Sequence, residues 1–324
     1  MSPHDGDRID RAVGAVLGSA VGDALGAPFE FGPEGAFSAR FPTPGGGGEM
    51  CGGGGWEPGE ATDDTQMAVL VGESLLEHGG LRLPDVFDRF QRWAAGEPKD
   101  IGLQTEDVLT NGEPWDLAAA LHFQINARAA GNGSLMRAST SAVYFAAAGR
   151  TATMDAGRRI AALTHGDAAA WEGTAVLHEL VRTALAGADP LAALPEVLGA
   201  VDPGHRERYA RVLAPDWRPA LATEFNGAVW PCLGTAVWAL RTTDGFEEAL
   251  RAAVDVGGDT DTVAAVTGTL AGAVYGSEAI PRRWTGPLHV PLPGFAGRVL
   301  DAAALRELAA SLTTAGRPGH QPAG

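Results

Sequence analysis

The sequence has 324 residues, of which 45% are hydrophobic, the usual share for a globular protein that buries a large core. Its 24 basic and 40 acidic residues give a net charge of −16, which argues against binding of nucleic acid or of an anionic membrane through a broad basic surface. Two cysteines, Cys51 and Cys232, are too few for a disulfide framework, and the N-terminus lacks the features of a signal peptide. We therefore expect a soluble, cytoplasmic monomer, and consider the apolar runs Ala12–Gly22 and Val263–Val274 too short to span a membrane.

Helical periodicity dominates the chain, and strand-like alternation is almost absent, so the sequence predicts an all-α fold. The first expected helix, residues 8–26, carries glycine at every fourth position from 14 to 26, which lets another backbone approach that face closely. Further helices are expected at residues 62–78, 84–95, 115–129, 135–148, 154–163, 168–185, 228–240, 246–256, 260–275 and 301–312.

The remaining segments set the expected domain boundaries. Residues 31–60 form a glycine-rich irregular loop, which is either a mobile lid or a solvated insertion, and residues 203–224 give a mixed signal because prolines interrupt them. No shift in composition divides the chain. We predict one compact domain over residues 8–315, with a flexible N-terminus at 1–7 and a flexible tail at 316–324.

Two expected helices begin with acidic residues and hydroxyls. The first start carries Thr62, Asp63 and Asp64, and the second, after two glycines, carries Asp259, Asp261 and Thr262. Helix capping explains one such residue at each start, but not four carboxylates. If the starts face each other, their charges require cations, and ligands that are all oxygen favour Mg²⁺ or Mn²⁺ in a binuclear site.

Four other segments offer polar groups in turns. Glu30 lies between two phenylalanines, where a carboxyl group can acquire a raised pKa suited to acid–base work, although a surface glutamate is the simpler interpretation. Asp100 is an isolated loop aspartate. The turn Gly131-Asn132-Gly133-Ser134 opens an expected helix and can hold a phosphate, or is an ordinary capped turn. His165 follows a helix end, in a break that contains a glycine.

Taken in order, these segments resemble the ADP-ribosylglycohydrolase family. The matching stretches are GDALGAPFEF (22–31), GEATDDTQMA (59–68), KDIG (99–102), GNGSLMR (131–137), THGD (164–167) and GGDTDTVAA (257–265). The pair of acidic stretches on a helical background is the most specific of these signals.

The resemblance implies a compact all-α domain with a central cleft that holds two divalent ions, and hydrolysis of the glycosidic bond between ADP-ribose and a protein side chain or related acceptor. It implies that Thr62, Asp63, Asp64, Asp259, Asp261 and Thr262 supply the metal ligands. It also implies that Glu30 and Asp100, with the metal-site Asp63 and Asp64, serve catalysis. Gly131, Asn132, Gly133, Ser134 and His165 would contact the ADP-ribose.

One segment departs from the family pattern. Where the family often has an aromatic residue that stacks on adenine, this chain has Ala228, and Phe225 or Trp230 would have to replace it.

Two other functions compete with the enzyme. A non-catalytic ADP-ribose-binding or crystallin-like protein of the same fold predicts eroded metal ligands, whereas all six are present. An all-α Mg²⁺-dependent diphosphate lyase predicts an Asp-Asp-x-x-Asp pattern, which Asp63 and Asp64 do not continue.

Overall fold

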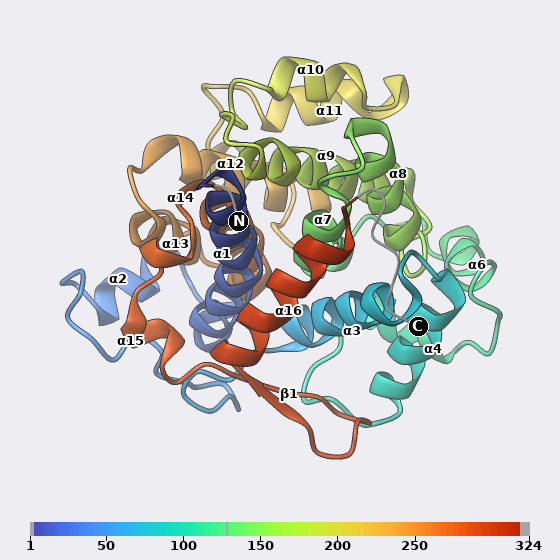
Figure 1. Cartoon of the computed structure of the whole chain (residues 1–324), viewed down its shortest axis with the longest axis horizontal. Coiled ribbons are helices and arrows are strands. Elements are labelled where there is room, and N and C mark those ends of the chain that lie inside the picture. Colours follow the sequence, from blue (N-terminus) through green and yellow to red (C-terminus); the bar gives the residue numbers. More distant parts are fainter. Residues whose placement is uncertain (1–2, 128, 318–324) are drawn as a thin grey trace.

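Helices account for most of the secondary structure in a computed structural model, which describes residues 3–127 and 129–317 (Figure 1). The elements in chain order are α1 (Pro3–Gly26), η1 (Ala27–Phe29), α2 (Ala36–Arg40), α3 (Asp63–His78), α4 (Leu83–Ala94), α5 (Leu103–Thr110), α6 (Ala118–Ile125), η2 (Asn132–Ser134), α7 (Ser139–Phe145), α8 (Arg150–Ala161), α9 (Ala168–Leu185), α10 (Leu194–Gly199), α11 (Pro203–Val212), η3 (Pro219–Leu221), α12 (Val229–Thr242), α13 (Phe246–Val254), α14 (Thr260–Tyr275), η4 (Ser277–Ala279), α15 (Arg282–Thr285), β1 (His289–Pro291), β2 (Val299–Asp301) and α16 (Ala302–Ala315). The expected all-α class is confirmed.

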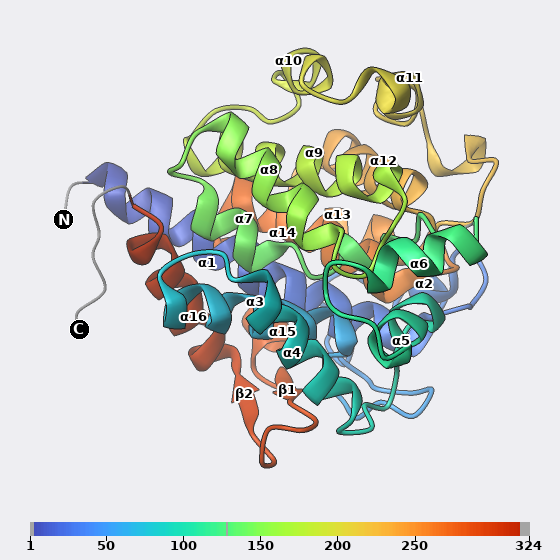
Figure 2. The ribbon, with the colours of Figure 1, turned by 90° about the vertical axis from the view of Figure 1, so that its right-hand side faces the viewer.

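Helix α1 runs through the centre of the molecule and packs along α14 in the antiparallel direction (Figures 1 and 2). A Cβ atom added to any of the four spaced glycines of α1 would overlap the backbone of α14. The clashing carbonyl oxygens belong to Gly272 for Gly14, Gly268 for Gly18, Ala264 for Gly22 and Thr260 for Gly26. The predicted close approach is therefore confirmed, and its partner is the second acidic helix.

Several boundaries differ from the expectation. Helix α1 begins at Pro3 rather than at residue 8, because proline is tolerated in a first helical turn, where Asp5 also suits the helix dipole. Residues 203–212 form α11, since Asp202 caps its first turn through a 2.8 Å bond to the amide of Gly204. The helices expected at 115–129 and 135–148 shorten to α6 and α7.

A hairpin interrupts the helical pattern near the C-terminal end. Strands β1 and β2 pair antiparallel, with Val290 opposite Leu300, and lie at the far side of the molecule from α10 and α11 (Figure 2). Three residues per strand are too few for alternation to be visible in the sequence. The expected tail at 316–324 lies mostly outside the described residues, which end at Arg317, and Arg317 pairs with Asp5 at 2.7 Å.

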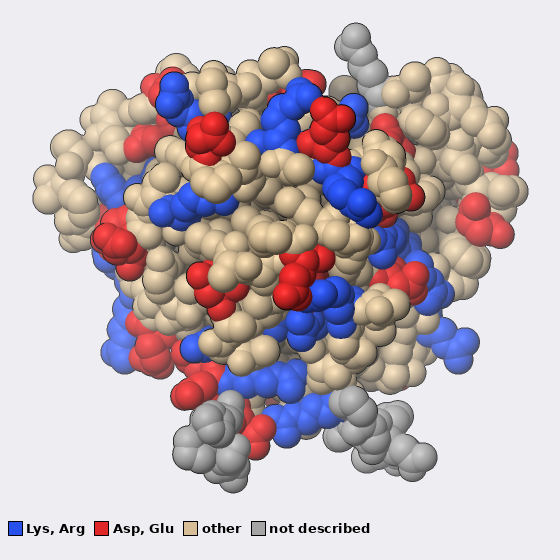
Figure 3. All heavy atoms as spheres, turned by 90° about the horizontal axis from the view of Figure 1, so that it is seen from above, with Lys and Arg blue, Asp and Glu red and all other residues tan. Residues whose placement is uncertain are grey.

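The surface and the loops add three observations. Over α10 and α11, basic and acidic side chains are interspersed without a continuous basic patch (Figure 3). Part of the glycine-rich loop is anchored, because Glu49 is buried and lies 3.3 Å from Arg283. Cys51 and Cys232 are both free thiols.

By length and composition alone, the helical stretch Asp5–Phe29 would suffice to cross a membrane, and our expectation that its apolar run is too short is wrong by that criterion. The stretch is longer than the run Ala12–Gly22 because the helix also includes the mostly charged residues 5–11 and continues through residues 23–29. In the structure, 94% of the most apolar 18-residue part of this stretch is buried inside the protein, as in a core helix.

We predict that Gly22→Ala destabilises the protein by about 1–3 kcal/mol or more, because the new methyl group meets a backbone carbonyl that cannot rotate away. Chemical denaturation measures this change. Gly199→Ala is the matched control, since Gly199 is exposed in a helix with open space around it, and the substitution should be neutral or stabilising. Equal behaviour of the two variants would contradict the importance of the close approach.

Candidate active site

The two acidic helix starts lie side by side. Helix α3 begins at Asp63 and α14 at Thr260, and the hydroxyl of Thr262 donates a 3.4 Å hydrogen bond to Oδ2 of Asp64. Both starts open into one cleft of about 350 Å³. The carboxylates that line it are Glu30, Asp63, Asp64, Asp100, Asp259 and Asp261. Residues far apart in the sequence therefore form one strongly acidic cavity.

Glu30 and Asp100 reach this cleft from two separate loops. Glu30 follows the short helix η1, which continues directly from α1, and its carboxylate lies within 4.8 Å of those of Asp259 and Asp261. Asp100 lies in the segment between α4 and α5. The two carboxyl groups that the sequence singled out as isolated thus line the same cleft as the acidic helix starts.

The turn at residues 131–134 lies at the cleft as well, but its form differs from the prediction. It is a 3₁₀ helix, and the next α-helix begins only at Ser139 rather than directly after the turn. The amide of Asn132 already donates to the carbonyl of Gly227 at 2.9 Å. Gly131, Asn132 and Gly133 line the cleft.

His165 lies against this turn and is held by a buried chain of hydrogen bonds. Arg137, which is fully buried, donates to Oγ1 of Thr164 at 2.7 Å and to the carbonyl of Gly133 at 3.0 Å. Oγ1 of Thr164 lies 2.8 Å from Nδ1 of His165. Because the hydroxyl accepts from Arg137, it can donate its proton to Nδ1, which leaves Nε2–H as the donor near Gly131 and Gly133. Burial lowers the pKa of His165 well below its usual value, so the ring is neutral.

Two predicted residues have other partners and do not line the cleft. The hydroxyl oxygen of Thr62 caps α3 by accepting from the amide of Asp64 at 3.4 Å. Ser134 is buried and accepts a 3.0 Å hydrogen bond from the hydroxyl of Thr174. The predicted roles of Thr62 in metal binding and of Ser134 in ligand binding stay predictions.

The cleft carries negative charge that its own lining does not neutralise. Burial, followed by the neighbouring carboxylates, raises the pKa values of Asp63, Asp64 and Asp261 well above the usual range. Burial and the nearby Asp259 raise the pKa of Glu30 to about 7. Neither lysine nor arginine occurs among the described residues that line the cleft. The folded chain therefore concentrates like charges without a cation of its own at the surface of the cleft.

These residues fit hard divalent cations better than they fit helix capping. Oδ1 of Asp64 is buried and has no hydrogen-bond partner, as expected for an atom that awaits a ligand. Asp259 occupies the N-cap position of α14, but its side chain accepts no capping hydrogen bond. The donor set consists of carboxylate and hydroxyl oxygens, which Mg²⁺ and Mn²⁺ prefer.

Asp23 is a site residue that the sequence reasoning missed. It lies on α1, is fully buried, and accepts hydrogen bonds from the amides of Thr62 (3.0 Å) and Thr65 (3.1 Å) and from the hydroxyl of Thr65. It therefore caps α3 from outside and leaves the carboxylates of Asp63 and Asp64 directed to the cleft. Burial raises the pKa of Asp23 to about 6, although these hydrogen bonds oppose the shift. Its position one residue after Gly22, on the helix that the glycines bring close, was the available signal.

Asn226 and Asn132 hold Asp259 in place through side-chain hydrogen bonds. The side-chain oxygen of Asn226 accepts from the amide of Asp259 at 3.0 Å, and its amide group donates to the carbonyl of Gly257 at 2.8 Å. The side chain of Asn132 donates to Oδ2 of Asp259 at 2.9 Å. Asn226 was missed because an Asn-Gly pair in a sequence normally indicates a turn.

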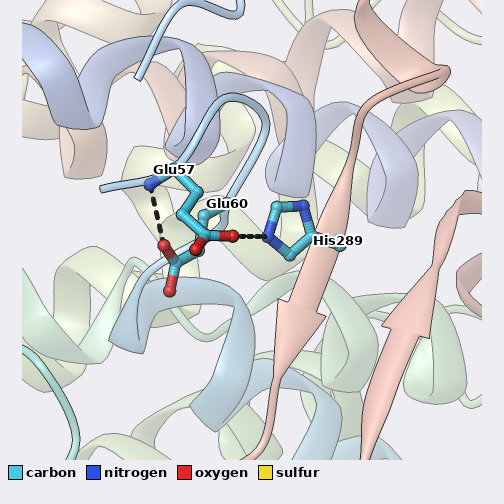
Figure 4. A group of neighbouring side chains, drawn as sticks. All are labelled: Glu57, Glu60 and His289. Atoms are coloured by element: carbon cyan, nitrogen blue, oxygen red, sulfur yellow. Dashed lines mark hydrogen bonds and ion pairs between the residues drawn. The ribbon is translucent and has the colours of Figure 1, made fainter. Parts of the chain in front are cut away.

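A second acidic group, Glu57, Glu60 and His289, lies beside the hairpin (Figure 4). Glu60 is buried and accepts from the amide of Glu57 at 2.8 Å, while Nε2 of His289 lies 3.7 Å from Glu57. The ammonium of Lys99, the only lysine in the sequence, lies 2.7 Å from Glu60. This ion pair supplies the positive charge that buried Glu60 requires, and it ties the glycine-rich loop to the segment that carries Asp100.

Comparisons with known proteins agree with this geometry. The family model described as ADP-ribosylglycohydrolase matches residues 4–320. The chain is 31% identical to the ADP-ribosyl-[dinitrogen reductase] glycohydrolase of Rhodospirillum rubrum, over 90% of this chain and 95% of that protein. It is 30% identical to an ADP-ribosylarginine hydrolase of Pseudomonas putida, over 85% and 73% of the two chains. A solved structure titled ADP-ribosylglycohydrolase-related protein complex superposes with a TM-score of 0.76 at 36% identity, covering 96% of this chain and 99% of that one.

We predict that Asp64→Asn does not destabilise the protein in the presence of a chelator, because it removes one of several buried like charges. Mg²⁺ should stabilise the wild type by about 2.7 kcal/mol at about 100 times its Kd, and the variant much less at the same concentration. Thermal melts with chelator and with Mg²⁺ measure both effects.

The exposed Asp155→Asn provides a control with the same change of charge, and it should respond to Mg²⁺ as the wild type does. A variant that loses stability in chelator, together with a wild type indifferent to Mg²⁺ and Mn²⁺, would mean that Asp64 has a structural role.

Proposed function

The chain belongs to the ADP-ribosylglycohydrolase family and is a hydrolase of ADP-ribose glycosidic bonds, and on that premise we propose that it releases ADP-ribose from arginine side chains in a reaction that depends on Mg²⁺ or Mn²⁺. The acceptor part of the proposal is supported by the relatives in Rhodospirillum and Pseudomonas, whose names specify a modified protein and ADP-ribosylarginine. The ion part is supported by the acidic cleft itself.

The observation that carries the proposal is the convergence of six carboxylates in one cleft of the size of a small ligand, with a buried oxygen of Asp64 lacking a partner. Asp63 and Asp64 from α3, with Asp259, Asp261 and Thr262 from α14, would hold the ions. When bound, the cations would offset most of the negative charge of the carboxylates and act as Lewis acids toward the ribose hydroxyls and the attacking water.

The residues around the ion site would orient the substrate and move protons. Cleavage at the anomeric carbon develops oxocarbenium character, so nearby carboxylates stabilise the transition state. Water adds its oxygen to that carbon while the bond to the guanidine nitrogen breaks, and one proton passes from the water to the leaving nitrogen. Glu30 and Asp100 are the carboxyl groups that we propose for this transfer. The neutral His165 would donate through Nε2–H to the ADP-ribose, beside Gly131 and Gly133.

The two competing functions fit less well. A non-catalytic binding protein would not need to keep buried carboxylates together at a cost in stability, whereas the whole acidic set is present and lines a cleft. A diphosphate lyase is disfavoured because the family match covers residues 4–320.

The proposal predicts that the purified chain releases ADP-ribose from an arginine-modified protein with Mg²⁺ or Mn²⁺ and loses at least about 100-fold in rate with a chelator. The measurement is the ADP-ribose released, with a serine-modified peptide as the second substrate. Full activity after metal removal would contradict the metal dependence, and release from serine alone would contradict the acceptor.

A second prediction concerns proton transfer. Glu30→Gln and Asp100→Asn should each lower kcat by about 100-fold or more while they change the Kd for ADP-ribose little, because proton handling matters mainly in the transition state. Glu34→Gln, an exposed glutamate in the same loop, is the matched control and should retain wild-type turnover. If both variants keep full kcat, neither residue takes part in the reaction.

A further inference from the structure

Two exposed aromatic rings stand at the mouth of the acidic cleft. Phe31 follows Glu30 and is 74% exposed, and Phe225 precedes α12 and is 57% exposed. Their rings are stacked, with centroids 6.4 Å apart and planes 21° from parallel. Phe31 lines the acidic cleft, while Phe225 lines a neighbouring hollow of about 660 Å³ that shares Gln104 and Gly131 with it. The pair therefore stands where the two cavities meet.

The backbone of Phe31 is held in an unfavourable conformation. Its φ of +56° lies in the left-handed region, which a residue with a large side chain rarely adopts. The amide of Phe31 donates to the carbonyl of Gly258 at 2.6 Å, and the amide of Gly258 donates to the carbonyl of Gly32 at 3.1 Å. These bonds fix Phe31 to the turn that directly precedes Asp259.

Glycines make the space that Phe225 occupies. A Cβ atom on Gly227 would lie 2.9 Å from Cδ1 of Phe225, and one on Gly258 would lie 3.0 Å from its Cε2. Gly258 has a φ of +74°, so glycine suits its conformation as well. Each ring is therefore placed by constraints from the same turn that carries the acidic start of α14.

The stability of the fold does not account for this arrangement. Rings that keep more than half of their surface in water gain little from burial, so they cannot offset the strain at Phe31. Strained residues that persist beside a cleft point to a function in binding. The exposed surface of each residue is the flat face of an aromatic ring, which favours a planar ligand group.

The charge of the cleft selects among planar partners. Six carboxylates and neither lysine nor arginine line it among the described residues, so its field attracts cations. Two divalent ions would carry four positive charges against six carboxylates, so up to two negative charges would remain when all six are ionised. A guanidinium is planar, weakly hydrated and positively charged, and it stacks on aromatic faces. A neutral nucleobase would stack as well but would gain nothing from the field.

We propose that Phe31 and Phe225 form a stacking site for the guanidinium of the ADP-ribosylated arginine, and so determine the preference for arginine as the acceptor. This inference rests on the proposed function and adds the residues that recognise the acceptor. The rings hold the leaving group at the rim, beside Glu30, while the ADP-ribose occupies the cleft. They contribute to recognition and not to the chemical step.

The test uses Phe31→Leu and Phe225→Leu, which keep an apolar side chain and remove the aromatic face. For an arginine-ADP-ribosylated peptide, KM should rise about threefold to tenfold in each variant with kcat largely retained. The Kd for free ADP-ribose, which has no guanidinium, should stay at the wild-type value. Val299→Ala, an equally exposed apolar residue on β2, is the control and should change neither quantity.

Binding of agmatine to the wild type in the presence of Mg²⁺ and ADP-ribose gives a readout without turnover, and both leucine variants should weaken it. Weaker ADP-ribose binding in the variants would assign the rings to adenine and overturn the proposal, as would an unchanged KM for the arginine peptide. A wild type that leaves arginine-linked ADP-ribose intact would contradict the proposed function. The agmatine titration would still decide the stacking site.

Discussion

The backbone-to-backbone contact of α1 with α14 sets the geometry on which the cleft depends. Because four glycines at a spacing of four remove every Cβ from one face of α1, the carbonyls of α14 come within the space that a methyl group would need. The antiparallel direction brings the end of α1, at Gly26, against the start of α14, at Thr260. From the same helix Asp23 caps α3. Helix α1 therefore lies against both acidic starts, and Asp23 accepts hydrogen bonds from the first turn of α3 in place of Asp63 and Asp64.

The grouping of buried carboxylates in the cleft lowers the stability of the fold but provides the site with its function. Carboxylates that share a buried site repel one another and lose their hydration, which is why the pKa values of Asp63, Asp64 and Asp261 lie well above the usual range. The fold compensates elsewhere, through the tight α1–α14 contact and through a buried network that includes Arg137, Thr164 and His165. The two asparagines at Asp259 add directional hydrogen bonds without adding charge. These hydrogen bonds hold the side chains in place without a ligand, which favours binding of ions and substrate in one defined geometry.

The rim of the cleft differs in character from its floor. The floor consists of acidic side chains on helix starts, whereas the rim consists of loops that carry Glu30, Phe31, Asp100 and Phe225. The Lys99–Glu60 ion pair links two of these loops at 2.7 Å, so the segment before α3 and the segment before Asp100 are held together. Binding and catalytic residues often lie on loops that a rigid scaffold positions, and the loops of this rim have that relation to the helices of the floor. Phe31 and Phe225 lie in these loops, where side chains can distinguish one acceptor from another.

The sequence by itself determined the helical class, the close approach along α1, and the segments that meet in the cleft, because helical periodicity, glycine spacing and clustered carboxylates are local patterns. It could not show that Asp23 caps α3 or that Asn226 holds Asp259, since these bonds join residues 39 and 33 positions apart. It misjudged the turn at residues 131–134, where the amide of Asn132 pairs with the distant carbonyl of Gly227. The stacking of Phe31 on Phe225 was equally invisible. Tertiary structure decided these features because each depends on which distant segment of the chain packs against the residue. The local conformational preferences of a residue do not specify that segment.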